Sequence, residues 1–217
     1  MAQVAVIGLG RFGFHVAQSL HLAGHDVLAV DIHSENVQRI RDFSSRAVVL
    51  DARDKERLDA LGIRDFDVIV VSLGERVDAS ALVALHLREL GVKRLITKAG
   101  SEDHRKLLEL IGVDEVVFPE REAAERLAHR LTSPNVIDFI PLGKDYSIHE
   151  VAPPDSFVGR TLGDLQIRNR FQVQVLAVRD VLTQEIHVNP GAELMVKPSD
   201  ALLVLGRDQD LARLKQV

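Results

Sequence analysis

Three glycines near the start of the chain have the spacing of a phosphate-binding loop. Gly8, Gly10 and Gly13 form a G-x-G-x-x-G pattern directly after the apolar run at residues 4–7. In this pattern the first glycine permits a tight turn, the second lets backbone approach a diphosphate, and the third lets a helix pack on a strand. The helix N-terminus also offers unpaired N–H groups and a partial positive charge to phosphates. The motif therefore predicts a nucleotide-binding site.

Asp31 is the second residue with a defined chemical role in this pattern. It closes the apolar run at residues 27–30, which indicates a second strand after the glycine loop. An acidic residue at this point can accept hydrogen bonds from ribose hydroxyls. Ile32 follows it and joins the predicted lining of the site. The alternative is a glycine turn that binds nothing, and it is disfavoured because glycines, strand, helix and acid all agree.

Arg11 adds a charge inside the glycine loop, next to Phe12 at the start of the expected helix. A guanidinium at this place can pair with two phosphate oxygens at once. Ordinary dinucleotide folds need no charge there, so Arg11 indicates extra negative charge, as on a γ-phosphate. The alternative is a solvated arginine beside a turn.

Residues at the ends of later strand-like runs join the candidate site, because ligands bind at the carboxyl edge of a parallel sheet. They are Asp51 and Ala52 after the third run, Ser72, Leu73 and Gly74 after the fourth, Lys98 after the fifth and Glu120 after the sixth. Asp51 could reach adenine or ribose, or could N-cap the next helix. Lys98 could face the ligand or be a surface ion. Glu120 could serve the site or interact with a helix dipole.

The first part of the chain, residues 1–132, alternates strand and helix patterns. Apolar runs that predict buried parallel strands lie at residues 4–7, 27–30, 47–50, 68–72, 95–97 and 116–118. Helical patterns after the glycine-loop helix lie at residues 34–43, 54–61, 77–90, 102–110 and 120–131. This alternation predicts an α/β domain with a Rossmann-like, doubly wound parallel sheet of order 3-2-1-4-5-6. The ligand is expected at the switch point beyond Gly8, Asp31 and Ser72.

The pattern changes near Ser133 and Pro134, so residues 133–217 are expected to form a linker and a small α+β C-terminal subdomain. Short strand-like runs follow at residues 136–140, 148–152, 173–178, 185–188 and 201–205, and helical patterns at 161–167 and 208–215. Ionisable residues of this part, such as His149, Lys144 and Arg168, form no catalytic constellation. A dehydrogenase needs a proton donor from its second domain, so the sequence favours a sensor over an enzyme.

Composition excludes several classes of protein. The 217 residues carry a net charge of −5 and no long basic run, which argues against nucleic acid as a partner. The absence of cysteine excludes disulfides and thiolate chemistry, and the nine histidines form no HExxH zinc motif. No apolar stretch approaches the roughly 20 residues that span a bilayer. A strand expected from about residue 3 leaves no room for a signal peptide, so we expect a cytosolic protein that could dock on a membrane protein.

Taken together, several segments resemble the RCK-domain (regulator of K⁺ conductance) subunits of Ktr potassium-uptake systems, the KtrA family. The resemblance rests on residues 4–13, 24–31, 135–138, 146–148 and 202–206, and it extends over the whole chain. TrkA subunits are similar, but they usually hold two such units in one chain and favour NAD(H). The resemblance implies a regulatory subunit without catalytic residues, at the inner face of the cell membrane.

The family implies a specific assembly and ligand set. RCK dimers assemble into an octameric ring beneath a membrane K⁺-translocating subunit of the KtrB or TrkH type. ATP and ADP compete for the Rossmann site, with NAD or NADH as the alternative ligand. Carried over by motif, Gly8, Gly10, Arg11 and Gly13 would hold phosphate and Asp31 the ribose, with Arg11 on the γ-phosphate.

Two further sites are implied by the resemblance alone. Glu120 matches a family glutamate that helps bind a cation (Mg²⁺, Ca²⁺ or Na⁺) between neighbouring subunits. The C-terminal subdomain of relatives can bind cyclic di-AMP at a dimer interface, and Leu162, Leu165 and Arg168 fall in the matching segment.

Two alternative functions use the same glycine motif. One is an NAD-dependent oxidoreductase. The other is a redox-sensing nucleic-acid repressor, which the acidic charge balance disfavours.

Overall fold

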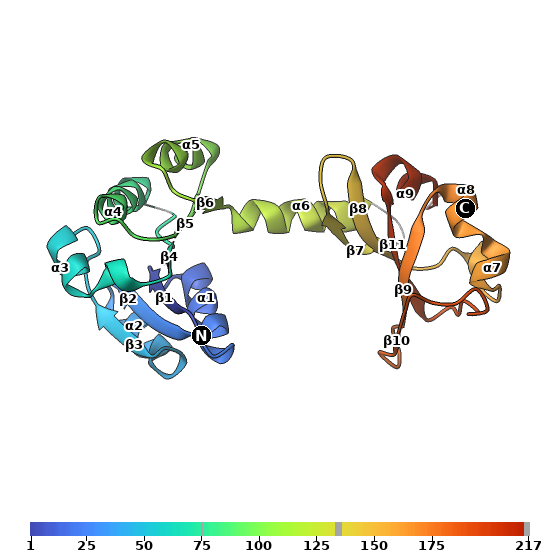
Figure 1. Cartoon of the computed structure of the whole chain (residues 1–217), viewed down its shortest axis with the longest axis horizontal. Helices are drawn as coiled ribbons and strands as arrows, with labels where there is room; N and C mark the ends of the chain where they lie inside the picture. Colours follow the sequence, from blue (N-terminus) through green and yellow to red (C-terminus); the bar gives the residue numbers. More distant parts are fainter. Residues whose placement is uncertain (75, 133–135, 215–217) are drawn as a thin grey trace. The chain divides into compact units, whose positions relative to one another are not determined.

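The computed structural model describes residues 1–74, 76–132 and 136–214. The chain divides into two compact units, Met1–Arg121 and Glu122–Val217, and each has its own sheet (Figure 1). The predicted change of pattern at Ser133 and Pro134 and the predicted helix end at Lys215 lie outside the described residues. Within the described residues, no helix is long and apolar enough to cross a membrane.

The described part of the first unit contains a six-stranded parallel sheet in the order β3-β2-β1-β4-β5-β6. Its strands are β1 (Gln3–Ile7), β2 (Asp26–Asp31), β3 (Arg46–Val49), β4 (Val68–Val71), β5 (Leu95–Lys98) and β6 (Glu115–Val117). The predicted doubly wound fold and its strand order are therefore confirmed. The order reverses between β1 and β4, so a crevice opens at the carboxyl ends of these two strands.

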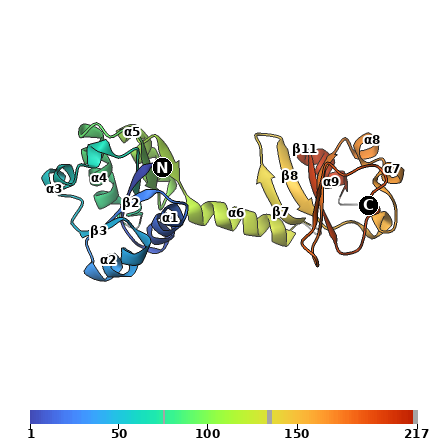
Figure 2. The ribbon, with the colours of Figure 1, turned by 60° about the horizontal axis from the view of Figure 1, so that its bottom comes forward.

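Helices cover both faces of this sheet. They are α1 (Arg11–Leu22), α2 (Ser34–Ile40), α3 (Lys55–Ala60), α4 (Val77–Glu89) and α5 (Glu102–Ile111). Helices α1 and α2 pack together against β1, β2 and β3, whereas α4 packs with α3 and α5 on the other face (Figure 2). This division follows from right-handed crossovers that run in opposite directions from the centre of the sheet. A further helix, α6 (Pro119–Thr132), begins directly after β6.

Strand β1 supplies side chains to two hydrophobic cores. Ala5 and Ile7 belong to the core beneath α3, α4 and α5, while Val4 and Val6 belong to the core beneath α1 and α2. Side chains alternate along a strand, and a sheet covered on both faces therefore needs apolar residues at every position. The continuous apolar run before the glycine loop thus places that loop at the end of a fully buried strand.

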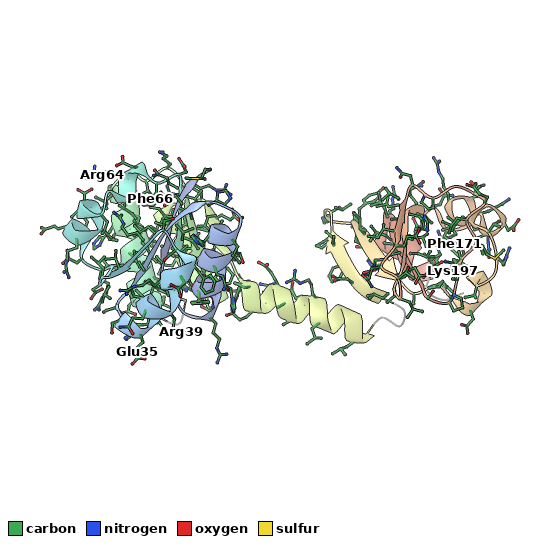
Figure 3. All side chains as sticks on the ribbon, turned by 90° about the horizontal axis from the view of Figure 1, so that it is seen from below. Glu35, Arg39, Arg64, Phe66, Phe171 and Lys197 are labelled. Atoms are coloured by element: carbon green, nitrogen blue, oxygen red, sulfur yellow. The ribbon has the colours of Figure 1, made fainter. Side chains whose placement is uncertain are left out.

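The second unit contains a five-stranded antiparallel sheet in its described part, in the order β10-β9-β11-β8-β7. Its elements are β7 (Val136–Pro141), β8 (Tyr146–Val151), α7 (Leu162–Leu165), α8 (Ile167–Phe171), β9 (Gln174–Asp180), β10 (Ile186–Val188), β11 (Asp200–Arg207) and α9 (Asp208–Leu214). The helix predicted at residues 161–167 is divided into α7 and α8, because Gln166 adopts a left-handed conformation with φ of 45°. Phe171, labelled in Figure 3, belongs to the core of this unit. Its ring lies 6.2 Å from that of Phe157, measured between ring centres.

Candidate functional site

The three glycines of the loop between β1 and α1 occupy positions with different steric demands. Gly8 has a φ of +91°, and its N–H donates to the carbonyl of Val30 at 2.8 Å. A Cβ on Gly13 would stand 1.9 Å from the carbonyl oxygen of Gly8, so only glycine lets α1 approach β1 this closely. Gly10 is the N-cap of α1, and a Cβ there would meet no atom within 4 Å. Gly8 and Gly13 therefore shape the loop, while Gly10 leaves open space above it.

Asp31, at the end of β2, is anchored to the glycine loop. Its side chain is buried, with 7% of the residue surface exposed. Oδ2 accepts a hydrogen bond from the N–H of Leu9 at 2.7 Å, and Oδ1 accepts one from the N–H of His33 at 2.8 Å. A carboxylate has about four acceptor positions, so both oxygens keep capacity for ribose hydroxyls. The structure thus brings the predicted phosphate loop and ribose acceptor into direct contact.

One end of the cavity beside Asp31 is largely apolar. Its lining residues are Ile7, Gly8, Val30, Asp31, Ile32, His33, Leu50, Asp51, Ala52, Arg53, Leu73, Arg76, Ala79 and Val83. The apolar members come from β1, β2, the end of β3 and α4. A cleft of this composition suits a flat heterocycle such as adenine, with polar groups at its rim to orient it. The predicted residues Ile32 and Ala52 both line this end.

Asp51 lies at the rim of the apolar end and is paired with Arg53. The guanidinium of Arg53 contacts both carboxylate oxygens, with Nη2 to Oδ2 at 2.6 Å and Nε to Oδ1 at 3.0 Å. These hydrogen bonds from Arg53 lower the pKa of Asp51 to about 2. Asp51 does not cap α3, because the N-cap is Asp54, whose side chain accepts from the N–H of Arg57. Asp51 is therefore a charged group at the rim of the apolar end of the cavity.

The other end of the cavity is polar and has a volume of about 500 Å³. It is lined by Gly8, Gly10, Arg11, Phe12, Asp31, His33, Asn36, Ser72, Leu73, Gly74, Arg76, Lys98 and Glu120. Five of these residues also line the apolar end: Gly8, Asp31, His33, Leu73 and Arg76. The two ends therefore form one continuous cavity. Of the residues predicted to hold phosphate, Gly8, Gly10 and Arg11 line this end, whereas Gly13 does not line it and instead packs against the Gly8 carbonyl. His33, Asn36 and Arg76 also line it and were not predicted, although each follows a strand end by a few residues.

Lys98 and Glu120 form an ion pair at the far side of the polar end. Lys98 is mostly buried, with 15% of its side chain exposed, whereas Glu120 is 64% exposed. The Lys98 ammonium also lies 6.0 Å from the centre of the Phe12 ring. The hydrogen bond from Lys98 lowers the pKa of Glu120. Each charge of this pair already has a partner within the first unit.

Glu120 is also the residue predicted to hold a cation. Among the described residues, no three carboxylate or imidazole side chains gather closely enough to hold a metal ion by themselves. Glu120 supplies one carboxylate at the cavity wall, so a cation there would need phosphate oxygens or a neighbouring subunit for its other ligands. Glu120 also lies in the first turn of α6, where a negative charge interacts favourably with the helix dipole.

Arg11 differs from Lys98 because it has no hydrogen bond or ion pair with any residue that the structure describes. It is exposed in the first turn of α1 and lines the polar end of the cavity. The guanidinium is therefore free to meet a phosphate group. Arg76, the other arginine that lines this end, is paired with Asp78 at 3.7 Å, so within the described part of the chain Arg11 is the arginine of this cavity end without a partner.

A separate hollow in the second unit contains part of the segment predicted for cyclic di-AMP. Leu162 and Arg168 line it, together with Gly163, Gln166, Ile167, Asn169, Val173, Gln174, Val175, Pro190 and Ala192. Leu165, in contrast, is fully buried in the hydrophobic core of this unit. The hollow thus presents one arginine and several backbone and apolar surfaces.

Comparison with known proteins places the chain among potassium-transport proteins. Residues 4–119 match the TrkA-N domain family and residues 147–217 the TrkA-C domain family. Ktr system potassium uptake protein C of Bacillus subtilis (strain 168) is 37% identical over 214 residues, covering 99% of this chain and 96% of that protein. Ktr system potassium uptake protein A of the same organism is 35% identical over 211 residues, covering 97% and 94%.

Solved structures show the same fold. The GsuK channel bound to NAD aligns with a TM-score of 0.71 and 20% identity, covering 98% of this chain and 38% of that chain. GsuK bound to ADP aligns with a TM-score of 0.55 and 19% identity, covering 62% of this chain and 36% of that chain.

Proposed function

The chain belongs to the Ktr family of potassium-uptake proteins, with a TrkA-N and a TrkA-C domain, and on that premise we propose that it is a nucleotide-sensing regulatory subunit. It binds ATP or ADP at the carboxyl edge of the first sheet and gates a membrane potassium transporter. The function needs no catalysis: two ring conformations with different affinities for the two nucleotides are sufficient. A ligand that bound both conformations equally would shift nothing.

One observation carries the choice of ATP and ADP. Three cationic side chains line the polar end of the cavity. Lys98 is paired with Glu120 and Arg76 with Asp78 at 3.7 Å, whereas Arg11 has no partner among the described residues. The loop amides and the α1 N-terminus supply donors for a diphosphate. The uncommitted guanidinium of Arg11 then supplies the charge that distinguishes a third phosphate from two.

Arg11→Ala is expected to weaken ATP binding by about 10- to 150-fold, since one charge-assisted contact is worth about 1.5–3 kcal/mol. ADP binding should change little, because the γ-phosphate contact is absent there. Isothermal titration calorimetry of both nucleotides measures the effect. Arg39→Ala is the matched control. Arg39 lies on α2 (Figure 3), its guanidinium stands over the Phe14 ring, and it is not among the residues that line the cavity. Equal losses for ATP and ADP would remove the γ-phosphate role from Arg11.

Glu120 is proposed to bind a cation, Mg²⁺, Ca²⁺ or Na⁺, together with the nucleotide phosphates. Glu120→Gln should abolish the increase in ATP affinity that these cations produce, because the variant lacks the carboxylate charge. Cation-free ATP binding should stay equal or become tighter, since the variant releases Lys98 from its ion pair. Titrations with and without each cation test this, with Glu109→Gln on α5 as the control. Unchanged cation dependence would leave Glu120 with the helix-dipole role alone.

Assembly into a homo-oligomeric ring is proposed from family membership, and exposed apolar surfaces support it. In the first unit, an open groove on the sheet face is lined by Val4, Phe12, His15, Val16, Ser19, Leu20, Val68, Val70 and Ile96. On α6, Leu127 and Leu131 share one helix face and are 47% and 77% exposed. Apolar surfaces of this kind mark contacts between proteins. The ring would sit on the cytoplasmic side of the membrane, against the potassium-translocating subunit.

NAD(H) is the second candidate ligand of the same cavity. The GsuK channel bound to NAD supports it, as does the Asp31 carboxylate, which suits the ribose of either ligand. Cyclic di-AMP is proposed for the hollow of the second unit, where Arg168 offers a charge for phosphate. Leu162 lies on the same wall, while Leu165 would act there only through the packing of α7.

A further inference from the structure

We propose that His104 is a positioning residue that holds the Lys98 end of the nucleotide cavity through the backbone of Gly100 and Gly74. The inference rests on the proposed function, because it assigns a role in binding the terminal phosphates. His104 lies in the first turn of α5 and does not line the cavity itself. It acts through a short chain of contacts that begins at its ring.

The imidazole of His104 serves as an acceptor for the loop between β5 and α5. The side chain is buried, with 1% of the residue surface exposed, and Nδ1 accepts a hydrogen bond from the N–H of Gly100 at 3.2 Å. Burial lowers the pKa of His104, which favours the neutral ring with one acceptor nitrogen. The hydroxyl of Ser101 accepts a hydrogen bond from the backbone N–H of His104 at 3.2 Å. His104 is therefore hydrogen-bonded to both residues that precede α5, Gly100 and Ser101.

The other ring nitrogen indicates why this residue is a histidine. With Nδ1 accepting, Nε2 carries the hydrogen, yet Nε2 is buried and has no hydrogen-bond partner among the described residues. An unpaired buried donor is destabilising, so an apolar side chain would suit the core better. The bond to Gly100 is the interaction that an apolar side chain at this position would lack.

Gly100 transmits this restraint to the cavity. A Cβ on Gly100 would stand 2.4 Å from the carbonyl oxygen of Gly74, so the two backbones are in close contact. A Cβ on Gly74 would in turn stand 3.3 Å from the side-chain carbons of Lys98. Lys98 is therefore held between the Gly74 backbone and its ion-pair partner Glu120. A shift of Gly100 would therefore displace the Gly74 backbone, which lies beside the Lys98 side chain.

The strand order predicts which part of a bound nucleotide is affected by the contacts that run from His104 through Gly100 and Gly74 to Lys98. Asp31 on β2 and Asp51 after β3 lie on one side of the glycine loop, and Gly74 after β4 and Lys98 on β5 lie on the other. The adenosine end of the ligand therefore faces the first pair, and the terminal phosphates face the second. Loss of the His104 bond should weaken ATP binding and leave AMP binding unchanged.

The test compares His104→Leu with His104→Asn in the full-length protein, by calorimetry with ATP and with AMP. Leucine removes the acceptor and releases the Gly100 loop, so ATP affinity should fall by up to about fivefold, since the value of one typical hydrogen bond is the upper limit, while AMP affinity stays within about twofold. Asparagine can place its amide oxygen where Nδ1 stands, so it should retain wild-type affinity for both. Gly100→Ala should lower ATP affinity at least as much as leucine does, because its Cβ displaces the Gly74 backbone, with Gly143→Ala as a control because a Cβ there meets no atom within 4 Å.

Each outcome decides the matter. Wild-type ATP affinity in His104→Leu overturns the inference, and so does an equal loss of ATP and AMP affinity, which is the sign of general destabilisation. Failure of asparagine to retain ATP affinity also overturns it. If the wild-type protein binds AMP and NADH but gains nothing from the extra phosphates of ATP, the proposed function itself fails, which is a separate result.

Discussion

Gly13→Ala is expected to abolish nucleotide binding and to destabilise the first unit of the protein. The new Cβ would stand 1.9 Å from the carbonyl oxygen of Gly8, a contact that only a backbone shift can relieve. Overpacking of this kind costs about 3 kcal/mol or more when backbone atoms are involved. Moving α1 away from β1 would also move the loop amides and Arg11 from their places. Denaturant unfolding and calorimetry with ATP measure the two effects.

Gly10→Ala is the matched control for that substitution. A Cβ on Gly10 meets no atom within 4 Å, and Gly10 has no positive φ, so the ligand-free protein should keep its stability. Nucleotide affinity should still fall, because the Cβ would occupy the space above the loop. If the two variants unfolded at the same denaturant concentration, the close approach of α1 to β1 would not be the reason for Gly13.

Asp31→Ala has the second-largest expected effect, because its carboxylate anchors the glycine loop and, in the proposed function, also holds the ribose. Removal of its oxygens leaves the N–H groups of Leu9 and His33 without acceptors, and Leu9 is fully buried. Each buried orphan donor costs about 1–3 kcal/mol. We expect the free energy of unfolding to fall by about 2 kcal/mol and the affinity for ATP, ADP and NADH to fall together, by about 100-fold.

An equal loss of affinity for ATP, ADP and NADH would distinguish Asp31→Ala from Arg11→Ala, which should weaken ATP binding alone. Comparison with 2′,3′-dideoxy-ATP completes a double-mutant cycle. The wild-type protein should prefer ATP over the dideoxy nucleotide, and Asp31→Ala should bind both equally. An undiminished preference for ATP in the variant would contradict the ribose role of Asp31 and leave it as an anchor of the glycine loop.

The first sheet could be predicted from the sequence because its signals are local. Continuous apolar runs and the glycine loop predict buried parallel strands, and the right-handed crossover rule then restricts their order. Boundaries are harder, because they depend on the last hydrogen bonds of an element. The predicted helix at residues 34–43, for example, ends as α-helix at Ile40 and continues as a 3₁₀ turn over Arg41–Phe43.

The second sheet is different, because its strand-like runs were predicted but their pairing was not. Strand β11, near the end of the chain, lies between β8 and β9. Antiparallel pairing between strands so far apart is decided by tertiary packing and leaves no local pattern in the sequence. The helix divides at Gln166, three residues after Gly163, so no glycine or proline stands at the position that adopts the left-handed conformation.

In the candidate site, too, the features that depend on tertiary packing could not be predicted from the sequence. Positions at strand ends placed Lys98, Glu120 and Asp51 at the correct edge of the sheet, since that edge follows from the fold. Their partners could not be predicted: the ion pair of Lys98 with Glu120 depends on where α6 begins, and that of Asp51 with Arg53 depends on the turn after β3. No sequence pattern indicated the proposed role of His104, because that role arises from the contact between two loops.

The most direct test of the central claim is calorimetric titration of the purified full-length protein with ATP, ADP, NADH and NAD in parallel. A nucleotide-sensing Ktr subunit with an uncommitted Arg11 at its phosphate loop should bind ATP and ADP more tightly than either dinucleotide, with ATP dependent on Arg11. Binding of NADH far more tightly than ATP would contradict the account and assign the cavity to NAD(H) sensing instead.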